Sequence, residues 1–130
     1  MKEETKALFD KAARAIKLAE KILRDSDQEL DFAAGRAYYA MFYIAKGLLL
    51  EKGLSRFTKH RAVHSAYVEN FSRSKVLDPK YHRWMIDAFD KRLQDDYEAY
   101  SNVTSEDVQS MLQQAREFLD AATGYLKQIK

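Results

Sequence analysis

The sequence predicts an all-α fold, an up-and-down four-helix bundle with one additional short helix. Its 130 residues include four glycines and one proline, too few for the many turns of a β-rich fold. Apolar residues recur at alternating spacings of three and four, as on one face of a helix. The chain is 46% hydrophobic and 32% charged, which excludes a disordered chain and a membrane protein. We expect residues 1–130 to form a single domain.

Two long helices are expected in the first half of the chain. The first spans Glu3 to Arg24 and carries an apolar stripe made of Leu8, Ala12, Ile16, Ala19 and Leu23. The second begins after a capping-box pattern, Ser26-Asp27-Gln28-Glu29, and ends at Gly53. Its apolar stripe consists of Leu30, Ala34, Ala37, Met41, Ile44 and Leu48.

Three further helices are expected in the second half. A short one spans His60 to Phe71, with Val63, Tyr67 and Phe71 in line. The fourth begins with the cap residue Asp78 followed by Pro79, and runs to about Tyr100. The fifth begins with a capping box at Thr104, flanked by Val103 and Val108, which are placed for a hydrophobic staple. The connecting loops are short, so neighbouring helices should be antiparallel.

Several kinds of site are excluded by residue types that are missing. The chain has no cysteine, so it has no disulfide, catalytic thiol or thiolate zinc site. His60 and His64 are four residues apart, but no His-Glu-x-x-His pattern is present and only His82 could be a third imidazole ligand. We therefore expect no metal and no cofactor. The longest apolar run has nine residues and no signal peptide precedes it, which predicts a cytoplasmic protein.

The charged residues are distributed unevenly. Residues 52–83 carry eight basic and two acidic side chains, together with all three histidines, in a chain whose net charge is only +2. Such a segment is a candidate surface for phosphate or nucleic acid. An ordinary solvated helix face is an equally good interpretation of the same charges.

The second predicted helix is apolar on more than one face. Opposite its main stripe lies a second stripe made of Arg36, Tyr39 and Tyr43. This stripe is expected to be buried by another helix, either of the same chain or of a second subunit. Tyrosine and arginine are favoured in subunit interfaces, which favours the second subunit slightly.

Arg92 is the most informative charged residue of the fourth predicted helix. Its helical phase places it in the middle of the apolar face that Tyr81, Met85 and Ala88 define. Asp96, four residues further on, can pair with Arg92 on that face. A structural ion pair is one interpretation, and a guanidinium that binds phosphate at the mouth of a cleft is the other.

Three motifs of this chain resemble those of HEPN-domain proteins, named for nucleotide binding in higher eukaryotes and prokaryotes. The first is Gly35-Arg36-Ala37-Tyr38-Tyr39-Ala40-Met41-Phe42, followed by Leu48-Leu49-Leu50-Glu51-Lys52-Gly53. The second is Lys59-His60-Arg61-Ala62-Val63, and the third is Arg92-Leu93-Gln94-Asp95-Asp96-Tyr97. The similarity extends from about residue 5 to residue 125 and is greatest to a small, single-domain prokaryotic group.

This resemblance implies a homodimeric helical bundle whose partner is a minimal nucleotidyltransferase, in a toxin–antitoxin-like system. It also implies a ribonuclease motif, in which a histidine follows the arginine after four to six residues. Arg92 matches the arginine, but residues 97, 98 and 99 are Tyr, Glu and Ala. Some partner transferases attach AMP to a tyrosine near this motif, which makes Tyr97 and Tyr100 candidate modification sites.

Three functions remain open at this point. The missing histidine and the basic segment favour a non-catalytic module that binds a nucleotide or RNA. The alternatives are a metal-independent ribonuclease toxin whose acid–base group is His60 or Tyr97, and a dimeric scaffold without a ligand. Whether the chain is an enzyme is left open, with binding favoured. The expected contacts to nucleotide or RNA come from six residues: Lys59, His60, Arg61, Arg92, Asp96 and Tyr97.

Overall fold

The computed structural model describes residues 1–25, 29–54, 56–97 and 102–129, and for residues 94–97 it describes the backbone only. All elements in this part of the chain are helical. They are α1 (Glu3–Asp25), α2 (Leu30–Glu51), α3 (His60–Tyr67), the π-helical turn η2 (Val68–Ser72), α4 (Lys80–Tyr97) and α5 (Ser105–Gln128). The predicted all-α fold is confirmed.

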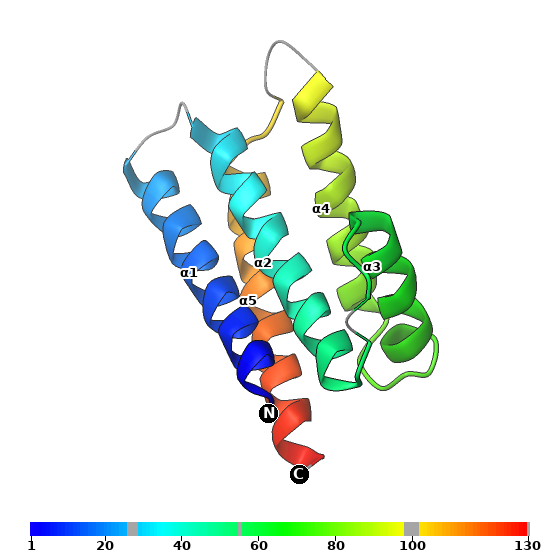
Figure 1. Cartoon of the computed structure of the whole chain (residues 1–130). Helices are drawn as coiled ribbons and strands as arrows, with labels where there is room; N and C mark the ends of the chain where they lie inside the picture. Colours follow the sequence, from blue (N-terminus) through cyan, green and yellow to red (C-terminus); the bar gives the residue numbers. More distant parts are fainter. Residues whose placement is uncertain (26–28, 55, 98–101, 130) are drawn as a thin grey trace.

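The four long helices run alternately up and down, and both chain ends lie at the same end of the bundle (Figure 1). Helix α2 packs against each of the other four α-helices. The short helix α3 lies at one edge, where it packs on α2 and α4. Twelve residues of α2 are buried, among them Tyr38. The central place of α2 explains why its sequence is apolar on more than one face.

A glycine allows α1 and α2 to approach closely. A Cβ atom on Gly47 would lie 2.7 Å from the ring of Phe9 in α1. The hydroxyl of Thr5 also donates a hydrogen bond to the carbonyl oxygen of Gly47, at 3.3 Å. Any larger residue at position 47 would therefore force the ring of Phe9 to shift.

The predicted helix ends agree well with the structure where it describes them. Gly53 has a φ of +80°, and the N–H groups of Gly53 and Leu54 donate to the carbonyls of Leu50 and Leu49, a Schellman motif. The capping box at Thr104 forms as predicted, with reciprocal hydrogen bonds between Thr104 and Asp107. The predicted cap at Ser26 lies outside the described residues.

One helix differs from its predicted form. The segment from His60 to Phe71 was expected to be a single α-helix, but it changes to a π-helical turn after Tyr67. In that turn the N–H of Arg73 donates to the carbonyl of Val68, five residues earlier, at 2.8 Å. The wider turn still leaves Val63, Tyr67 and Phe71 fully buried in the core.

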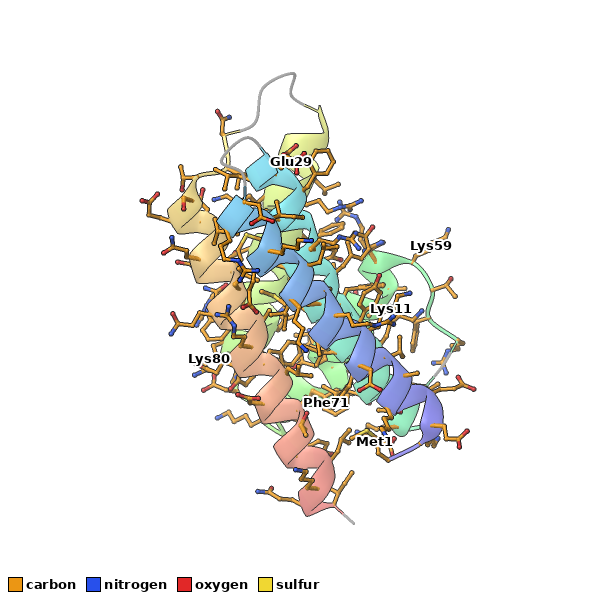
Figure 2. All side chains as sticks on the ribbon, turned by 90° about the vertical axis from the view of Figure 1, so that its left-hand side faces the viewer. Met1, Lys11, Glu29, Lys59, Phe71 and Lys80 are labelled. Atoms are coloured by element: carbon orange, nitrogen blue, oxygen red, sulfur yellow. The ribbon has the colours of Figure 1, made fainter. Side chains whose placement is uncertain are left out.

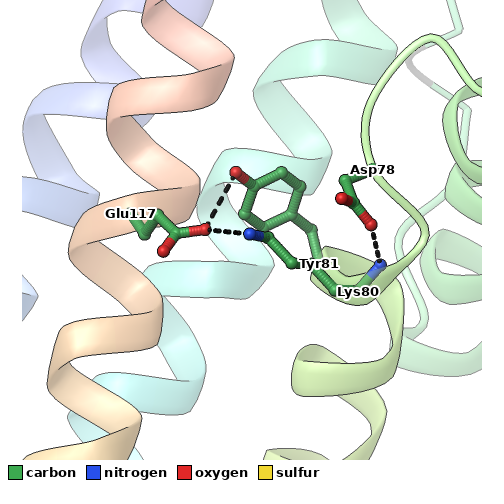
Figure 3. Close-up of polar contacts among 4 residues, drawn as sticks. All are labelled: Asp78, Lys80, Tyr81 and Glu117. Atoms are coloured by element: carbon green, nitrogen blue, oxygen red, sulfur yellow. Dashed lines mark hydrogen bonds and ion pairs between the residues drawn. The ribbon is translucent and has the colours of Figure 1, made fainter.

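Helix α4 is fixed to α5 at its first turn (Figure 3). The side chain of Asp78 accepts a hydrogen bond from the N–H of Lys80, as predicted for a cap at this position. The hydroxyl of Tyr81 donates to Glu117 at 3.1 Å, and Lys80 forms an ion pair with the same carboxylate oxygen at 2.8 Å. These contacts align α4 with α5 at the end of the bundle opposite to Arg92.

Candidate functional site

The sequence-predicted residues His60 and Arg92 lie in one cluster of polar and aromatic groups between α2, α3 and α4. Two tyrosines of α2, Tyr38 and Tyr39, form its centre. The guanidinium carbon of Arg92 lies 5.9 Å from the ring centre of Tyr38 and 5.0 Å from that of Tyr39. The imidazole of His60 lies 5.7 Å and 5.6 Å from the same two ring centres. A tandem pair of tyrosines therefore brings together residues of α3 and α4.

Both histidines of α3 bind the hydroxyl group of Tyr38. The hydroxyl oxygen lies 2.7 Å from Nδ1 of His60 and 2.9 Å from Nε2 of His64. Their spacing of four residues places both rings on the face of α3 that packs against α2. The ring of His60 also stacks on Phe42 with 4.3 Å between the ring centres. Tyr38 is completely buried, whereas His60 keeps a partly exposed edge.

The surroundings keep these imidazoles neutral. Burial lowers the pKa of His60, and the positive charges of Arg92 and Lys46 lower it further. Burial also lowers the pKa of His64 to about 4. The pKa of Tyr38 is raised, mainly by burial, while the positive charge of Arg92 opposes the rise. At neutral pH the hydroxyl is therefore protonated and both imidazoles are uncharged.

An open groove of about 270 Å³ lies beside this cluster, between α2 and α4. The guanidinium of Arg36 lies 4.9 Å from the ring centre of Tyr39, so two arginines contact the same ring. Phe32, of which 65% is exposed, forms part of the wall. The lining comprises Asp31, Phe32, Ala34, Gly35, Arg36, Tyr39, Lys91, Arg92 and Val103.

The electrostatic character of the groove follows from these residues. Arg36, Lys91 and Arg92 supply three positive charges, and Asp31 supplies one negative charge. Lys91 is also paired with Asp107 of α5 at 2.9 Å. A guanidinium can donate two parallel hydrogen bonds to a phosphate, and an exposed aromatic ring can stack on a base. The groove therefore has the chemistry for an aromatic phosphate compound.

The second stripe of α2 is half-buried in the structure. Arg36 and Tyr39 line the groove, and Tyr43 packs at the edge of the core, with Nζ of Lys11 from α1 4.8 Å from its ring centre. The stripe thus lies between α1 and α4, and each of its three residues keeps an accessible part.

The basic segment 52–83 does not form one continuous surface. Lys59 and Arg61 are exposed next to His60, and the guanidinium of Arg61 lies 5.6 Å from the ring centre of Phe89. Lys80 projects on the other side of the bundle from Lys59 (Figure 2) and is paired with Glu117. Lys59 and Arg61, beside His60, are thus basic residues of the segment that border the cluster.

Some predicted site residues are outside the described part of the chain. The side chains of Asp96 and Tyr97 are not described, nor is Tyr100, so the expected Arg92–Asp96 pair remains a prediction. Among the described residues, no group of three histidine, aspartate or glutamate side chains could hold a metal ion. None of the described helices is long and apolar enough to cross a membrane.

Sequence reasoning missed Tyr38, Phe32 and Lys91 in this site, and it considered His64 only as a metal ligand. Tyr38 was part of a family motif but had no assigned role, and Phe32 and Lys91 were not considered. The signal for Tyr38 was a polar tyrosine within the most apolar helix, since a buried hydroxyl needs a hydrogen-bond partner. Two histidines four residues apart were suitable partners. No comparable signal marked Phe32 or Lys91.

Comparison with known proteins adds an independent line of evidence. Residues 5–125 match a family model described as "HEPN domain". A protein of Methanocaldococcus jannaschii that is named as a candidate toxin is 30% identical over 96% of this chain and 83% of its own length. A UPF0332 protein of Gloeobacter violaceus is 33% identical over 98% of this chain and 100% of its own.

The buried histidines predict a loss of stability in mild acid. A histidine in the unfolded chain has a pKa near 6.5, whereas the pKa of His64 in the folded protein is about 4. Between these values the unfolded state binds more protons, so the free energy of unfolding should fall as the pH is lowered. The expected loss from pH 7 to pH 4.5 is about 2 kcal/mol from His64 alone, measurable by urea unfolding at each pH.

A His64→Gln variant is the comparison for this measurement, because it lacks the titrating group whatever its stability at neutral pH. Its free energy of unfolding should depend less steeply on pH between 6.5 and 4.5. An identical slope in the two proteins would contradict the assignment to His64.

Proposed function

This chain belongs to the HEPN-domain family, and on that premise we propose that it is a toxin-like module that binds a nucleotide or RNA in the groove between α2 and α4. The observation that supports this most directly is the pair of guanidiniums, of Arg36 and Arg92, against the ring of Tyr39. Arginine is suited to this role because its planar fork matches two oxygens of a phosphate group.

An exposed aromatic ring beside the arginines supports a nucleotide rather than inorganic phosphate. Phe32 is a large apolar side chain that is 65% exposed, and it is one of the residues that line the groove. A base stacked on an aromatic ring contributes about 1–3 kcal/mol to binding. In our proposal the phosphate contacts the arginines and the base lies against Phe32. Lys59 and Arg61 extend the positive surface toward a longer RNA.

We expect Arg92→Ala to weaken the binding of AMP at least tenfold, because the variant loses the two hydrogen bonds that the charged guanidinium donates to the phosphate. Arg92→Lys should restore only part of the affinity, since lysine keeps the charge but not the fork. Calorimetric titration with AMP measures both effects. Arg14→Ala is the control, because Arg14 is exposed on α1 and is not among the groove residues; its affinity should equal that of the wild type.

The melting temperature of each variant must be measured beside its affinity. A large drop in melting temperature for Arg92→Ala with unchanged AMP affinity would make Arg92 a structural residue and would contradict the proposal. For a short single-stranded RNA, log affinity should also fall linearly with log salt concentration. The slope should become smaller when Lys59 and Arg61 are both replaced by alanine.

A ribonuclease activity is the second candidate, and the position of His60 favours it. Metal-independent cleavage of RNA needs an acid–base group and a positive charge close to the scissile phosphate. His60 is neutral at pH 7, has a partly exposed edge, and lies against the same tyrosine ring as Arg92. It could thus replace the histidine that the family motif places after the arginine.

This candidate predicts that the wild-type protein cleaves RNA in the presence of EDTA and that His60→Ala abolishes the cleavage. His82→Ala provides a matched control, because it removes the imidazole that lies against Tyr67 instead. Gel electrophoresis of a labelled single-stranded RNA is a sufficient assay. Intact RNA after incubation with the wild type would exclude the ribonuclease and leave the binding function.

We further propose that the module, residues 1–130, acts in the cytoplasm as a homodimer with a minimal nucleotidyltransferase as partner. The half-exposed stripe of Arg36, Tyr39 and Tyr43 supports a second subunit, because it presents aromatic and arginine side chains at the surface of the central helix. Since Arg36 and Tyr39 also line the groove, the nucleotide would then bind at the border of the subunit interface. Light scattering at micromolar concentration should give twice the monomer mass of 15.1 kDa. A monomer mass would refute the dimer.

A further inference from the structure

Tyr38 occupies an unusual position between two histidines. Its hydroxyl is the hydrogen-bond partner of Nδ1 of His60 at 2.7 Å and of Nε2 of His64 at 2.9 Å. Tyr38 is fully buried and 5% of His64 is exposed, so water cannot readily replace either bond. The other ring nitrogen of His60, Nε2, makes no hydrogen bond within the described residues, and the ring keeps a partly exposed edge.

The hydroxyl of Tyr38 can donate only one hydrogen bond. This limits which nitrogens of the two imidazoles carry a proton. In the first arrangement, Nδ1–H of His60 donates to the oxygen of Tyr38, whose O–H donates to Nε2 of His64. In the second, Nε2–H of His64 donates to Tyr38, which donates to Nδ1 of His60. When both imidazoles are neutral, the first leaves Nε2 of His60 as an acceptor and the second makes it a donor.

We propose that Tyr38 is a positioning residue that couples the proton on His60 to the proton on His64, so that an oxyanion bound beside His60 changes the protonation of the buried His64. This inference rests on the proposed function, which places a phosphate next to Arg92. Phosphate oxygens accept hydrogen bonds, so they favour the arrangement in which Nε2 of His60 is a donor. His64 must then carry its proton on Nε2.

The change between the two arrangements balances, and every group is neutral before it and after it. Nδ1 of His60 passes its proton to the oxygen of Tyr38, and Tyr38 passes its own proton to Nε2 of His64. A solvent proton binds Nε2 of His60, and the proton on Nδ1 of His64 is released to solvent. Each imidazole begins and ends with one proton, and Tyr38 remains a neutral hydroxyl.

The surrounding charges favour neutral rings over an imidazolium. Arg92 from α4 and Lys46 from α2 face His60, and Arg61 and His82 lie near enough to disfavour a charge on His64. Phe42 and Phe89 pack against the rings and make their surroundings less polar, with 4.3 Å between the ring centres of Phe42 and His60 and 4.8 Å between those of Phe89 and His64. A proton that arrives at His60 is therefore accommodated by exchange of tautomers.

Long-range ¹H–¹⁵N NMR spectra of the histidine rings test this inference at pH 7.5, where the imidazoles are neutral. In the wild type, one of the two nitrogens that face Tyr38 should carry a proton and the other should not. Addition of AMP should shift the signal of His64 Nε2 toward that of a protonated nitrogen. In Tyr38→Phe, which keeps the ring but lacks the hydroxyl, the His64 signal should no longer respond to AMP.

Tyr67→Phe is the matched control. Tyr67 is as deeply buried as Tyr38, but its hydroxyl has no hydrogen-bond partner within the described residues. This variant should retain the wild-type pattern of histidine signals and the response to AMP. Two protonated or two unprotonated nitrogens facing Tyr38 in the wild type, or an unchanged His64 response in Tyr38→Phe, would overturn the coupling.

The two proposals can fail separately in this experiment. If AMP changes no signal of His60, His64 or Tyr39, the proposed binding function is wrong. The spectra without AMP still show whether Nδ1 of His60 and Nε2 of His64 share a single proton. If AMP changes the signals of Tyr39 and His60 but not that of His64, AMP binds at this cluster and the coupling through Tyr38 is refuted.

Discussion

The buried hydroxyl of Tyr38 fixes how the two histidines of the short helix α3 meet α2. A hydroxyl in the interior of a helical bundle costs about 1–3 kcal/mol unless it is hydrogen-bonded, and α2 uses its own carbonyl groups for helical bonds. Two imidazoles from α3 supply the partners. The same bonds orient His60 so that its other nitrogen lies at the edge of the cluster. The orientation of both histidines, and with it the geometry of the site, thus depends on one hydroxyl group.

Electrostatics divides the cluster into a neutral interior and a positive rim. His64 and Tyr38 are both held in their uncharged forms by burial. Arg36 and Arg92 remain at the surface, where the faces of aromatic rings attract their charge and water still solvates it. A phosphate that enters from solvent would therefore contact Arg36 and Arg92 before it reaches the neutral imidazole of His60. This order is suited to binding an anion beside a group that can accept or donate a proton.

Most of the fold could be predicted from the sequence because local rules determine it. Gly53 and Thr104 end and begin helices through contacts within a few residues, and both form as the sequence predicts. The site was less accessible to such reasoning. His60, Arg36 and Arg92 were each singled out, but their meeting at Tyr39 depends on the packing of three helices. The π-helical turn after Tyr67 was also missed, because the apolar spacing of three and four fits an α-helix equally well.

We propose Tyr39, in the groove between α2 and α4, as the place where a nucleotide binds. A second groove of about 340 Å³, more apolar and lined by Leu8, Leu54 and Phe57 among others, offers an alternative place for a ligand. NMR spectra that follow aromatic and methyl signals during titration with AMP distinguish the two sites. Our account predicts saturable shifts of the Tyr39 and Phe32 ring signals with unchanged Leu8 and Leu54 methyl signals. Shifts of the leucine methyl signals without a change at Tyr39 would contradict it.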